Sequence, residues 1–378
     1  MKLLTLEEWM SLFKRNMPGY EDFLAKARVR ASGGRLVKLL EYADDNKIPR
    51  RDLKLLYENI VERADYLGRF YNRSLLVDAG RFSMDSEAPM GATAMNNDRQ
   101  VMYKNVIRNM HYRDILRETR SGIPNVPTFL EVLENLYKKF IIDYKILTPS
   151  ARFYMKEGRL GSVFSSFYFR ASIMNPYLVY SLNRSVLSGT RVFTPTLGWS
   201  SYCYGFLECP DVVEYVGTDV IVDVCNKTRQ FSEKMENWKG KRVEIHCKPS
   251  EVLARSKPFL KKYSQHFDVV FFSPPYYRYE LYPGENQSTE TYSTYEEWLA
   301  GYWEPTIRLC HRVLQPGGRM CYILSDYGGD AEKFALVKDM NEIAKRHFTL
   351  KRVLPMHNKN VNSTAHRETA EKIMVFVK

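Results

Sequence analysis

The chain has few cysteines, no long apolar run and fewer acidic than basic side chains. Its six cysteines all follow residue 200 and include no CxxC pair, so neither a zinc site nor a disulfide framework is expected. No apolar run approaches the ~18 residues of a membrane-spanning helix, and acidic residues close to the N-terminus argue against a signal peptide. We therefore expect an intracellular protein, cytoplasmic or nuclear, that does not enter a membrane.

The excess of positive charge is spread along the chain. The net charge is +12, from 56 Lys and Arg against 44 Asp and Glu. Residues 1–150 hold 25 basic and 20 acidic side chains, and the remainder holds 31 and 24. This excludes a disordered basic arm, so a polyanionic partner, most simply nucleic acid, would bind a folded surface. The alternative is a basic globular protein without such a partner.

The pattern of apolar residues divides the 378 residues into two predicted domains. Residues 1–155 have mainly helical spacing, notably over 20–45, where Gly33 and Gly34 interrupt it, and over 127–142. This part contains no catalytic motif. Residues 156–378 alternate helical segments with short strands, expected at 191–196, 214–222, 242–247, 267–273 and 319–325, before a closing hairpin. Several of these strands are continuously apolar, which predicts an α/β, Rossmann-like fold with a mostly parallel sheet.

Ligands of such a sheet bind where the strands end, so the residues that leave each strand are the candidates for a site. The first strand runs into a turn of small residues around Gly198, which suits close approach of a ligand or a plain strand–helix connection. Asp219, on the second strand, is placed to bind ribose hydroxyls or to cap a helix. Glu251, after the third strand, could face an adenine amino group or belong to a helix capped by Ser250.

The fourth strand ends in the most specific motif, Ser273-Pro274-Pro275-Tyr276. Two prolines cannot continue a ladder and fix the backbone, so this corner presents acceptors, namely the Ser273 hydroxyl and the Pro274 carbonyl. Acceptors that grip the protons of an exocyclic base amine localise its lone pair and make it a better nucleophile, and Tyr276 can stack on the base. The alternative is a proline-rich loop with a packed tyrosine.

Residues 192–201, Asp219 and the tetrad, in this order, resemble the S-adenosylmethionine-dependent amino-methyltransferases of DNA. The resemblance covers about residues 160–378 and is greatest to a branch from phages and large DNA viruses. The first motif of that branch reads roughly Asp-Pro-x-x-Gly-Trp-Gly, and an acid, a tyrosine and a Gln-Ser pair follow its tetrad. The matching residues here are Pro195, Gly198 and Trp199, then Glu280, Tyr282, Gln287 and Ser288.

The resemblance implies S-adenosylmethionine as cofactor and methyl transfer to N6 of adenine or N4 of cytosine in a base flipped out of DNA, without a metal. It implies that the tetrad holds the target base. The residues expected to bind the methyl donor are Ser166, Phe167, Thr194, Pro195, Thr196, Gly198, Asp219 and Glu251. Tyr277, Arg278 and Glu280 are expected on the substrate side.

Two departures from the family pattern keep other functions open. Thr194 stands where the family has an acid, and Ser200 replaces the second glycine of the turn. The alternatives are a catalytically inactive subunit that binds nucleic acid or a partner, and an RNA methyltransferase. By elimination, residues 1–155 are expected to recognise the target or to bind a protein partner or a second copy. The loop 277–294 is the other candidate for target recognition.

Overall fold

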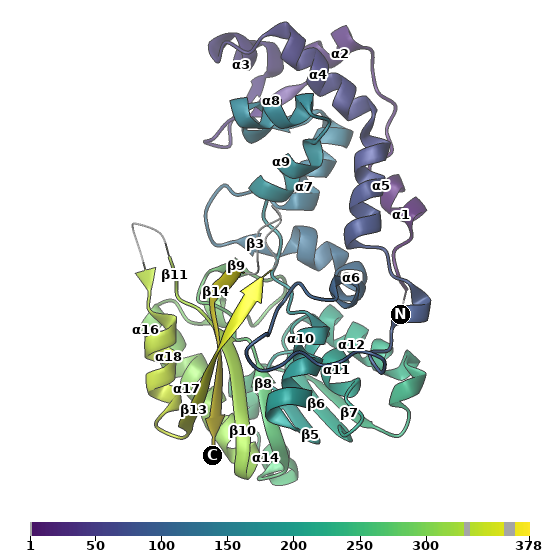
Figure 1. Ribbon diagram of the computed structural model, residues 1–378. Coiled ribbons are helices and arrows are strands. Elements are labelled where there is room, and N and C mark those ends of the chain that lie inside the picture. Colours follow the sequence, from purple (N-terminus) through teal and green to yellow (C-terminus); the bar gives the residue numbers. More distant parts are fainter. Residues whose placement is uncertain (1, 329–332, 359–366) are drawn as a thin grey trace. The chain divides into compact units, whose positions relative to one another are not determined.

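The computed structural model describes residues 2–328, 333–358 and 367–378 (Figure 1). The chain forms two compact units. The sheet unit comprises Asp78–His111 and Ile173–Lys378, and the helical unit comprises Lys2–Val77 and Tyr112–Ser172. These units do not follow the predicted boundary at residue 155, because residues 78–111 pack with the sheet and residues 156–172 with the helices.

A seven-stranded sheet forms the centre of the sheet unit, in the order β13-β14-β10-β8-β5-β6-β7. Its strands are β5 (Arg191–Thr194), β6 (Glu214–Asp219), β7 (Arg242–Cys247), β8 (Phe267–Phe272), β10 (Leu314–Leu324), β13 (Thr349–Asn358) and β14 (Arg367–Val377). The five strands from β7 to β10 are parallel, and β14 is antiparallel to both β10 and β13. The Rossmann-like α/β fold and the closing hairpin are therefore confirmed.

The strand order reverses beside β5. From β5 the chain builds outward through β6 to β7, and it then returns to lay β8 on the other side of β5. A reversal of this kind leaves a crevice at the carboxyl ends of the two central strands, because their connections leave in opposite directions. The carboxyl ends of β5 and β8 carry the glycine turn (residues 195–200) and the proline corner (residues 273–276).

The helices of the sheet unit pack in two groups (Figure 1). One contains α6 (Val101–Met110), α10 (Pro176–Leu182), α11 (Ser201–Leu207) and α12 (Val222–Lys234). The other contains α13 (Ser250–Leu253), α14 (Lys257–Tyr263), α17 (Glu304–Val313) and α18 (Leu336–Ala344). The short elements are β9 (Glu280–Leu281), α15 (Ser288–Thr291), α16 (Tyr295–Trp298), β11 (Tyr327–Gly328) and β12 (Lys333–Phe334). In β8, every residue except Asp268 is buried, as its apolar run predicts.

Residues 78–111 join the sheet unit although they precede its first strand by some eighty residues of sequence. The backbone N–H of Asn97 donates to the His357 carbonyl at 3.0 Å, and the N–H of His357 donates to Met95 at 2.8 Å. This segment therefore attaches to the end of β13, and α6 packs against α10. The composition of residues 82–99 predicts a loop, but does not reveal which strand that loop reaches.

The helical unit has its own core. Its elements are α1 (Leu6–Ser11), α2 (Tyr20–Lys26), β1 (Arg28–Arg30), β2 (Leu36–Lys38), α3 (Leu39–Asp45), α4 (Arg50–Val61), α5 (Arg63–Ser74), β3 (Arg120–Ser121), α7 (Phe129–Glu134), β4 (Ile141–Asp143), α8 (Pro149–Lys156) and α9 (Leu160–Phe167). The Phe70 ring stacks on Trp9 at 5.4 Å and on Phe129 at 4.6 Å, measured between ring centroids. Buried Asp52 pairs with Arg152 at 2.6 Å.

The helix predicted over residues 20–45 is wrong in its middle. There β1 pairs with β2 around Gly33 and Gly34, and with β4 on its other side. The helical spacing of Val29 and Leu36 does not distinguish a helix from two three-residue strands, because such short strands have no readable period. The helix predicted over 127–142 likewise ends early, since residues 141–143 form β4.

Candidate functional site

The glycine turn and the proline corner contact each other at the crevice. The Thr196 hydroxyl donates to the Ser273 carbonyl at 3.5 Å. The backbone N–H of Ser273 donates to the hydroxyl of Tyr202, in the first turn of α11, at 3.1 Å. The structure therefore brings together the two motifs that the sequence places 77 positions apart.

The glycine turn has an unusual backbone. Gly198, Trp199 and Ser200 have φ angles of 52°, 58° and 70°, all in the left-handed region. A Cβ on Gly198 would lie 2.3 Å from the Tyr202 ring, so only glycine fits there. Trp199 and Ser200 adopt this conformation at a cost of about 1 kcal/mol or more each, which the surrounding contacts offset. Ser200 is held by hydrogen bonds to His111 at 3.0 Å and Thr228 at 2.7 Å.

Asp219 ties the end of β6 to the glycine turn. One carboxylate oxygen accepts from the Leu197 N–H at 3.0 Å, and the other accepts from Val220 at 2.8 Å and Ile221 at 3.1 Å. Burial raises the pKa of this carboxyl, and the three N–H groups oppose the rise. Asp219 does not cap α12, whose N-cap is Ile221. It therefore lies at the crevice, where the ribose role predicted for it stays a prediction.

Thr194, at the end of β5, and Glu251, in α13, are both buried. The Thr194 hydroxyl lies 2.6 Å from the Tyr215 hydroxyl and has no exposed surface, so it faces the interior of the sheet unit. Pro195 is also buried. Glu251 is 8 % exposed, and its burial raises the pKa of its carboxyl. The Ser250 hydroxyl binds Thr306 at 2.7 Å and does not cap α13, whose N-cap is Pro249.

Hydrogen bonds to residues at the end of β10 hold the proline corner in place. The Ser273 hydroxyl donates to the Ile323 carbonyl at 3.2 Å, which leaves its lone pairs as acceptors. Pro274 is buried and Pro275 is half-buried. The Tyr276 hydroxyl accepts from the Ser325 N–H at 3.0 Å, and burial raises the pKa of Tyr276.

The residues that follow the corner make contacts within the protein that the sequence did not indicate. Tyr277 is 4 % exposed, its hydroxyl donates to the Ser293 carbonyl at 2.9 Å, and its ring packs on Tyr295. Arg278 is exposed, donates to the same carbonyl at 3.0 Å and lies over the Tyr277 ring. Glu280 is buried, and burial together with the charge of Glu280 raises the pKa of Tyr282. Their roles toward a substrate remain predictions.

Ser166 and Phe167 belong to α9 of the helical unit, not to the sheet unit. Ser166 is exposed and Phe167 is half-buried. Their predicted contact with a methyl donor remains a prediction. The supports that sequence analysis missed are Tyr202 under the turn and Ser325 behind Tyr276, and neither belongs to a motif that could have indicated its role.

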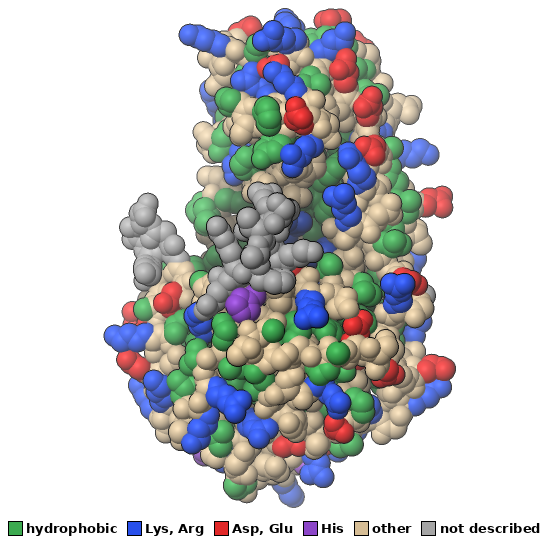
Figure 2. All heavy atoms as spheres, in the orientation of Figure 1, with side chains coloured by type: hydrophobic (Ala, Val, Ile, Leu, Met, Phe, Trp, Pro, Cys, Tyr) green, Lys and Arg blue, Asp and Glu red, His purple; other side chains and the backbone are tan. Residues whose placement is uncertain are grey.

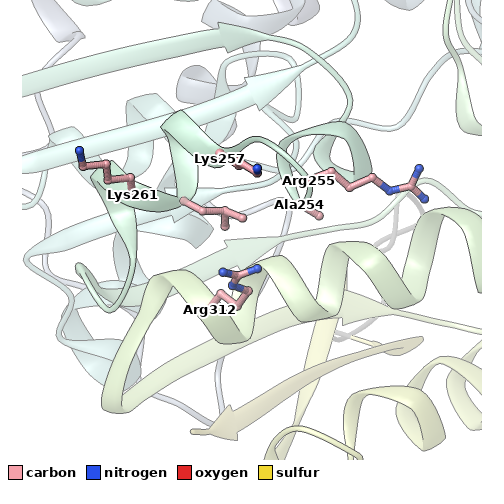
Figure 3. A pocket seen from close by; sticks show the side chains of 6 residues that line it. Ala254, Arg255, Lys257, Lys261 and Arg312 are labelled. Carbon is pink, nitrogen blue, oxygen red and sulfur yellow. The ribbon is translucent and has the colours of Figure 1, made fainter.

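A basic pocket lies on the surface between α13–α14 and α17 (Figure 3). Its volume is about 460 Å³, and it is lined by Ala254, Arg255, Lys257, Leu260, Lys261 and Arg312. The four cations are exposed, and none forms an ion pair with another described residue within 4.0 Å. On the face shown in Figure 2, Lys and Arg side chains are spread among Asp and Glu.

The described part of the chain has neither a cluster of metal ligands nor a membrane-spanning helix. Within residues 2–328, 333–358 and 367–378, no three or more His, Cys, Asp or Glu side chains are gathered as metal ligands. No helix in the same residues has the length and hydropathy needed to span a membrane.

The fold and the crevice define a Rossmann-like α/β protein with a ligand-binding crevice at the reversal of its sheet. Residues 267–378 match the family model described as DNA methylase, of the N6 and N4 type. The match begins at β8 and includes the whole proline corner. It supports S-adenosylmethionine-dependent methyl transfer, with S-adenosylmethionine as the cofactor. No curated protein sequence matches the chain.

Solved structures with a similar arrangement share little sequence with the chain. TrmN from Thermus thermophilus is 14% identical, with a TM-score of 0.35 over 54% of this chain and 49% of its own. The chain thus spans about half the length of that protein. The N-methyltransferase NodS from Bradyrhizobium japonicum WM9, in complex with S-adenosyl-L-homocysteine, is 10% identical, with a TM-score of 0.32 over 53% of this chain and 82% of its own. A putative RNA methyltransferase from Pyrococcus horikoshii is 13% identical, with a TM-score of 0.32 over 54% and 80%.

Proposed function

We propose that this chain transfers a methyl group from S-adenosylmethionine to the exocyclic amine of adenine or cytosine in DNA, on a base turned out of its stack. The observation that carries the proposal is the proline corner beside the glycine turn at the reversal of the sheet. The family match over residues 267–378 supports DNA as the substrate. The basic pocket and the net charge of +12 support a polyanionic partner.

The residues around the glycine turn fit the methyl donor. Gly198 gives the turn its left-handed backbone, Asp219 lies at the end of β6 as a partner for ribose hydroxyls, and Glu251 offers a buried carboxyl for an adenine amine. When bound, S-adenosylmethionine supplies an electrophilic methyl group.

The proline corner would act on the nucleophile. The Ser273 hydroxyl donates its hydrogen bond to the Ile323 carbonyl. Its oxygen is therefore free to accept a hydrogen bond from an incoming amine, together with the Pro274 carbonyl. Two acceptors that hold the amine protons draw the nitrogen toward sp³ geometry and stabilise the positive charge that develops there. Tyr276 would stack on the base, with an effect of about 1–3 kcal/mol.

The direct test is transfer of labelled methyl groups to duplex DNA, single-stranded DNA and RNA in parallel, followed by nucleoside analysis. We expect N6-methyladenine or N4-methylcytosine in DNA. Pro274→Ala and Tyr276→Ala should abolish transfer and leave donor binding in calorimetry largely intact, whereas Pro210→Ala, at an exposed proline, should have no effect. Wild-type activity in either corner variant would contradict the assigned roles, and methylation of RNA alone would contradict DNA as the substrate.

One observation favours a second candidate, an inactive methyltransferase fold that binds nucleic acid. The end of β5 carries the buried Thr194 hydroxyl, where the family has an acid to bind the ammonium of the donor. Calorimetry separates the two candidates. Absence of heat with millimolar S-adenosylmethionine, together with retained DNA binding, would favour the inactive fold.

A further inference from the structure

Ser200 is a buried serine in a backbone conformation that favours glycine. It ends the glycine turn with a φ of 70° and has no exposed surface. As the N-cap of α11 it would normally accept a hydrogen bond from the first turn of that helix, but its side chain makes no such bond. Its hydroxyl instead has partners at the end of α6 and in α12. The side chain therefore holds a residue whose backbone is strained.

The hydrogen bonds around Ser200 form a chain whose direction can be assigned. The Thr228 hydroxyl donates to the Val224 carbonyl at 2.7 Å, and a hydroxyl has one proton to donate. Thr228 therefore accepts from the Ser200 hydroxyl, which lies 2.7 Å away. Because Ser200 donates its proton to Thr228, it accepts from His111, whose Nε2 atom lies 3.0 Å from the Ser200 oxygen. It follows that Nε2 of His111 carries a proton.

The three side chains of this hydrogen-bond chain come from different parts of the sheet unit. His111 ends the segment 78–111, Ser200 belongs to the turn after β5, and Thr228 lies in α12. None of the three has exposed surface. Because bulk water does not reach them, the loss of one partner leaves a buried polar group without a hydrogen bond. The chain thus fixes the end of the turn against two helices.

His111 contacts the turn at a second residue. Its ring lies 5.9 Å from the Trp199 ring between centroids, with the ring planes inclined by 53°. Trp199 is also buried and has a φ of 58°. Both residues of the turn that have a left-handed backbone without being glycine therefore have His111 as a neighbour. His111 is itself anchored, since its backbone N–H donates to the Ile107 carbonyl at 3.0 Å.

We infer that His111 is a positioning residue of the methyl-donor site, which acts through Ser200 and Trp199 to hold the glycine turn in its left-handed conformation. Asp219 holds the same turn from the other side, at the Leu197 N–H. That the turn binds S-adenosylmethionine rests on the proposed function. The hydrogen bonds and the ring contact do not. No motif includes His111, because it lies 89 positions before Ser200 in the sequence.

The test compares His111→Leu with His111→Gln, in the wild-type chain and in Ser200→Gly. We expect His111→Leu to weaken binding of S-adenosylmethionine in calorimetry about tenfold, roughly the effect of one hydrogen bond. His111→Gln keeps an N–H donor and should restore most of the affinity. In Ser200→Gly the partner hydroxyl is absent, so His111→Leu should change the affinity by less than about twofold there. Unchanged affinity in His111→Leu, or an equal loss in both backgrounds, would overturn the inference.

Two further measurements separate this role from a general loss of stability. His347→Leu, the same substitution at a half-buried histidine that follows α18, should leave the affinity for the donor unchanged. In urea unfolding, Ser200→Gly leaves the His111 N–H buried without an acceptor, so the addition of His111→Leu should not lower the midpoint further. A second, additive loss would overturn the hydrogen bond.

NMR of the histidine ring nitrogens tests the direction of the hydrogen-bond chain without any donor. The signals that disappear in His111→Gln identify His111, and its Nε2 atom should carry a proton. A proton on Nδ1 alone would overturn the assigned chain. If the wild-type protein binds no S-adenosylmethionine, the proposed function fails, whereas these spectra and the unfolding cycle still decide whether His111 holds the turn.

Discussion

At the scale of single residues, Gly198 and Asp219 determine the shape of the crevice. Gly198 provides a left-handed backbone at a place where the Tyr202 ring excludes any side chain. The Asp219 carboxylate accepts a hydrogen bond from the backbone of the turn and so holds the turn at the end of β6. Both residues stood out in the sequence, but the reason for the glycine is the tyrosine four positions later.

We predict that Gly198→Ala weakens binding of S-adenosylmethionine and destabilises the protein by about 1–3 kcal/mol, because it combines a strained φ with a clash. Calorimetry and urea unfolding measure the two effects. Gly68→Ala is the matched control, since nothing lies within 4 Å of a Cβ at that helical position and alanine favours a helix. Equal stability of the two variants would contradict the crowding of the turn.

The Asp219 carboxyl should produce a pH dependence with a defined sign. Its pKa is raised in the folded protein, so the folded state holds the proton more tightly than the unfolded chain. Its contribution to stability is therefore fully present below the unfolded pKa and is lost as the pH rises through the folded pKa. Compared with Asp219→Asn, the wild-type protein should gain urea resistance as the pH falls from 7 toward 4, and a loss of resistance in that comparison would contradict the raised pKa.

At the scale of elements, the site depends on contacts between the end of one element and the beginning of another. The first turn of α11 supports the corner that follows β8, since the Tyr202 hydroxyl accepts the Ser273 N–H. The end of β10 supports the same corner through Ile323 and Ser325. Proline corners have few backbone donors of their own, which makes these outside contacts the main restraints on the corner.

Tyr202→Phe should therefore lower stability by about 1–3 kcal/mol, because it leaves the Ser273 N–H buried without an acceptor. We also expect slower methyl transfer, measured with the labelled donor. Tyr20→Phe is the control, since it removes a hydroxyl that donates to Arg50 at the surface at 3.3 Å. A loss of stability as small as that of Tyr20→Phe would mean that the corner does not depend on α11.

At the scale of the whole molecule, the positive charge is spread over both units, and the basic pocket is a place where it is concentrated. If the pocket binds phosphates, Lys261→Ala with Arg312→Ala should weaken DNA binding and reduce the slope of log affinity against log salt by about 1 for each phosphate that the variant no longer neutralises. Lys234→Ala with Lys345→Ala removes the same charge from α12 and the end of α18. Equal slopes for the two pairs would show that only net charge matters.

Much of this protein could be predicted from local sequence. The continuous apolar run of β8, the two prolines that end it and the alternation of strands with helices indicate a parallel sheet and a rigid acceptor corner, because each depends on neighbouring residues. The two three-residue strands around Gly33 could not be predicted, since they have no readable period.

Only the tertiary structure decided what surrounds the corner. The strand order sets β10 beside β8, which brings Ser325 to Tyr276 across 49 positions, and Tyr202 of α11 reaches Ser273 across 71 positions. Such contacts depend on strand order and register, which the spacing of residues in one sequence does not encode. The sequence alone thus determined the chemistry of the corner, whereas the fold determined which groups hold it in place.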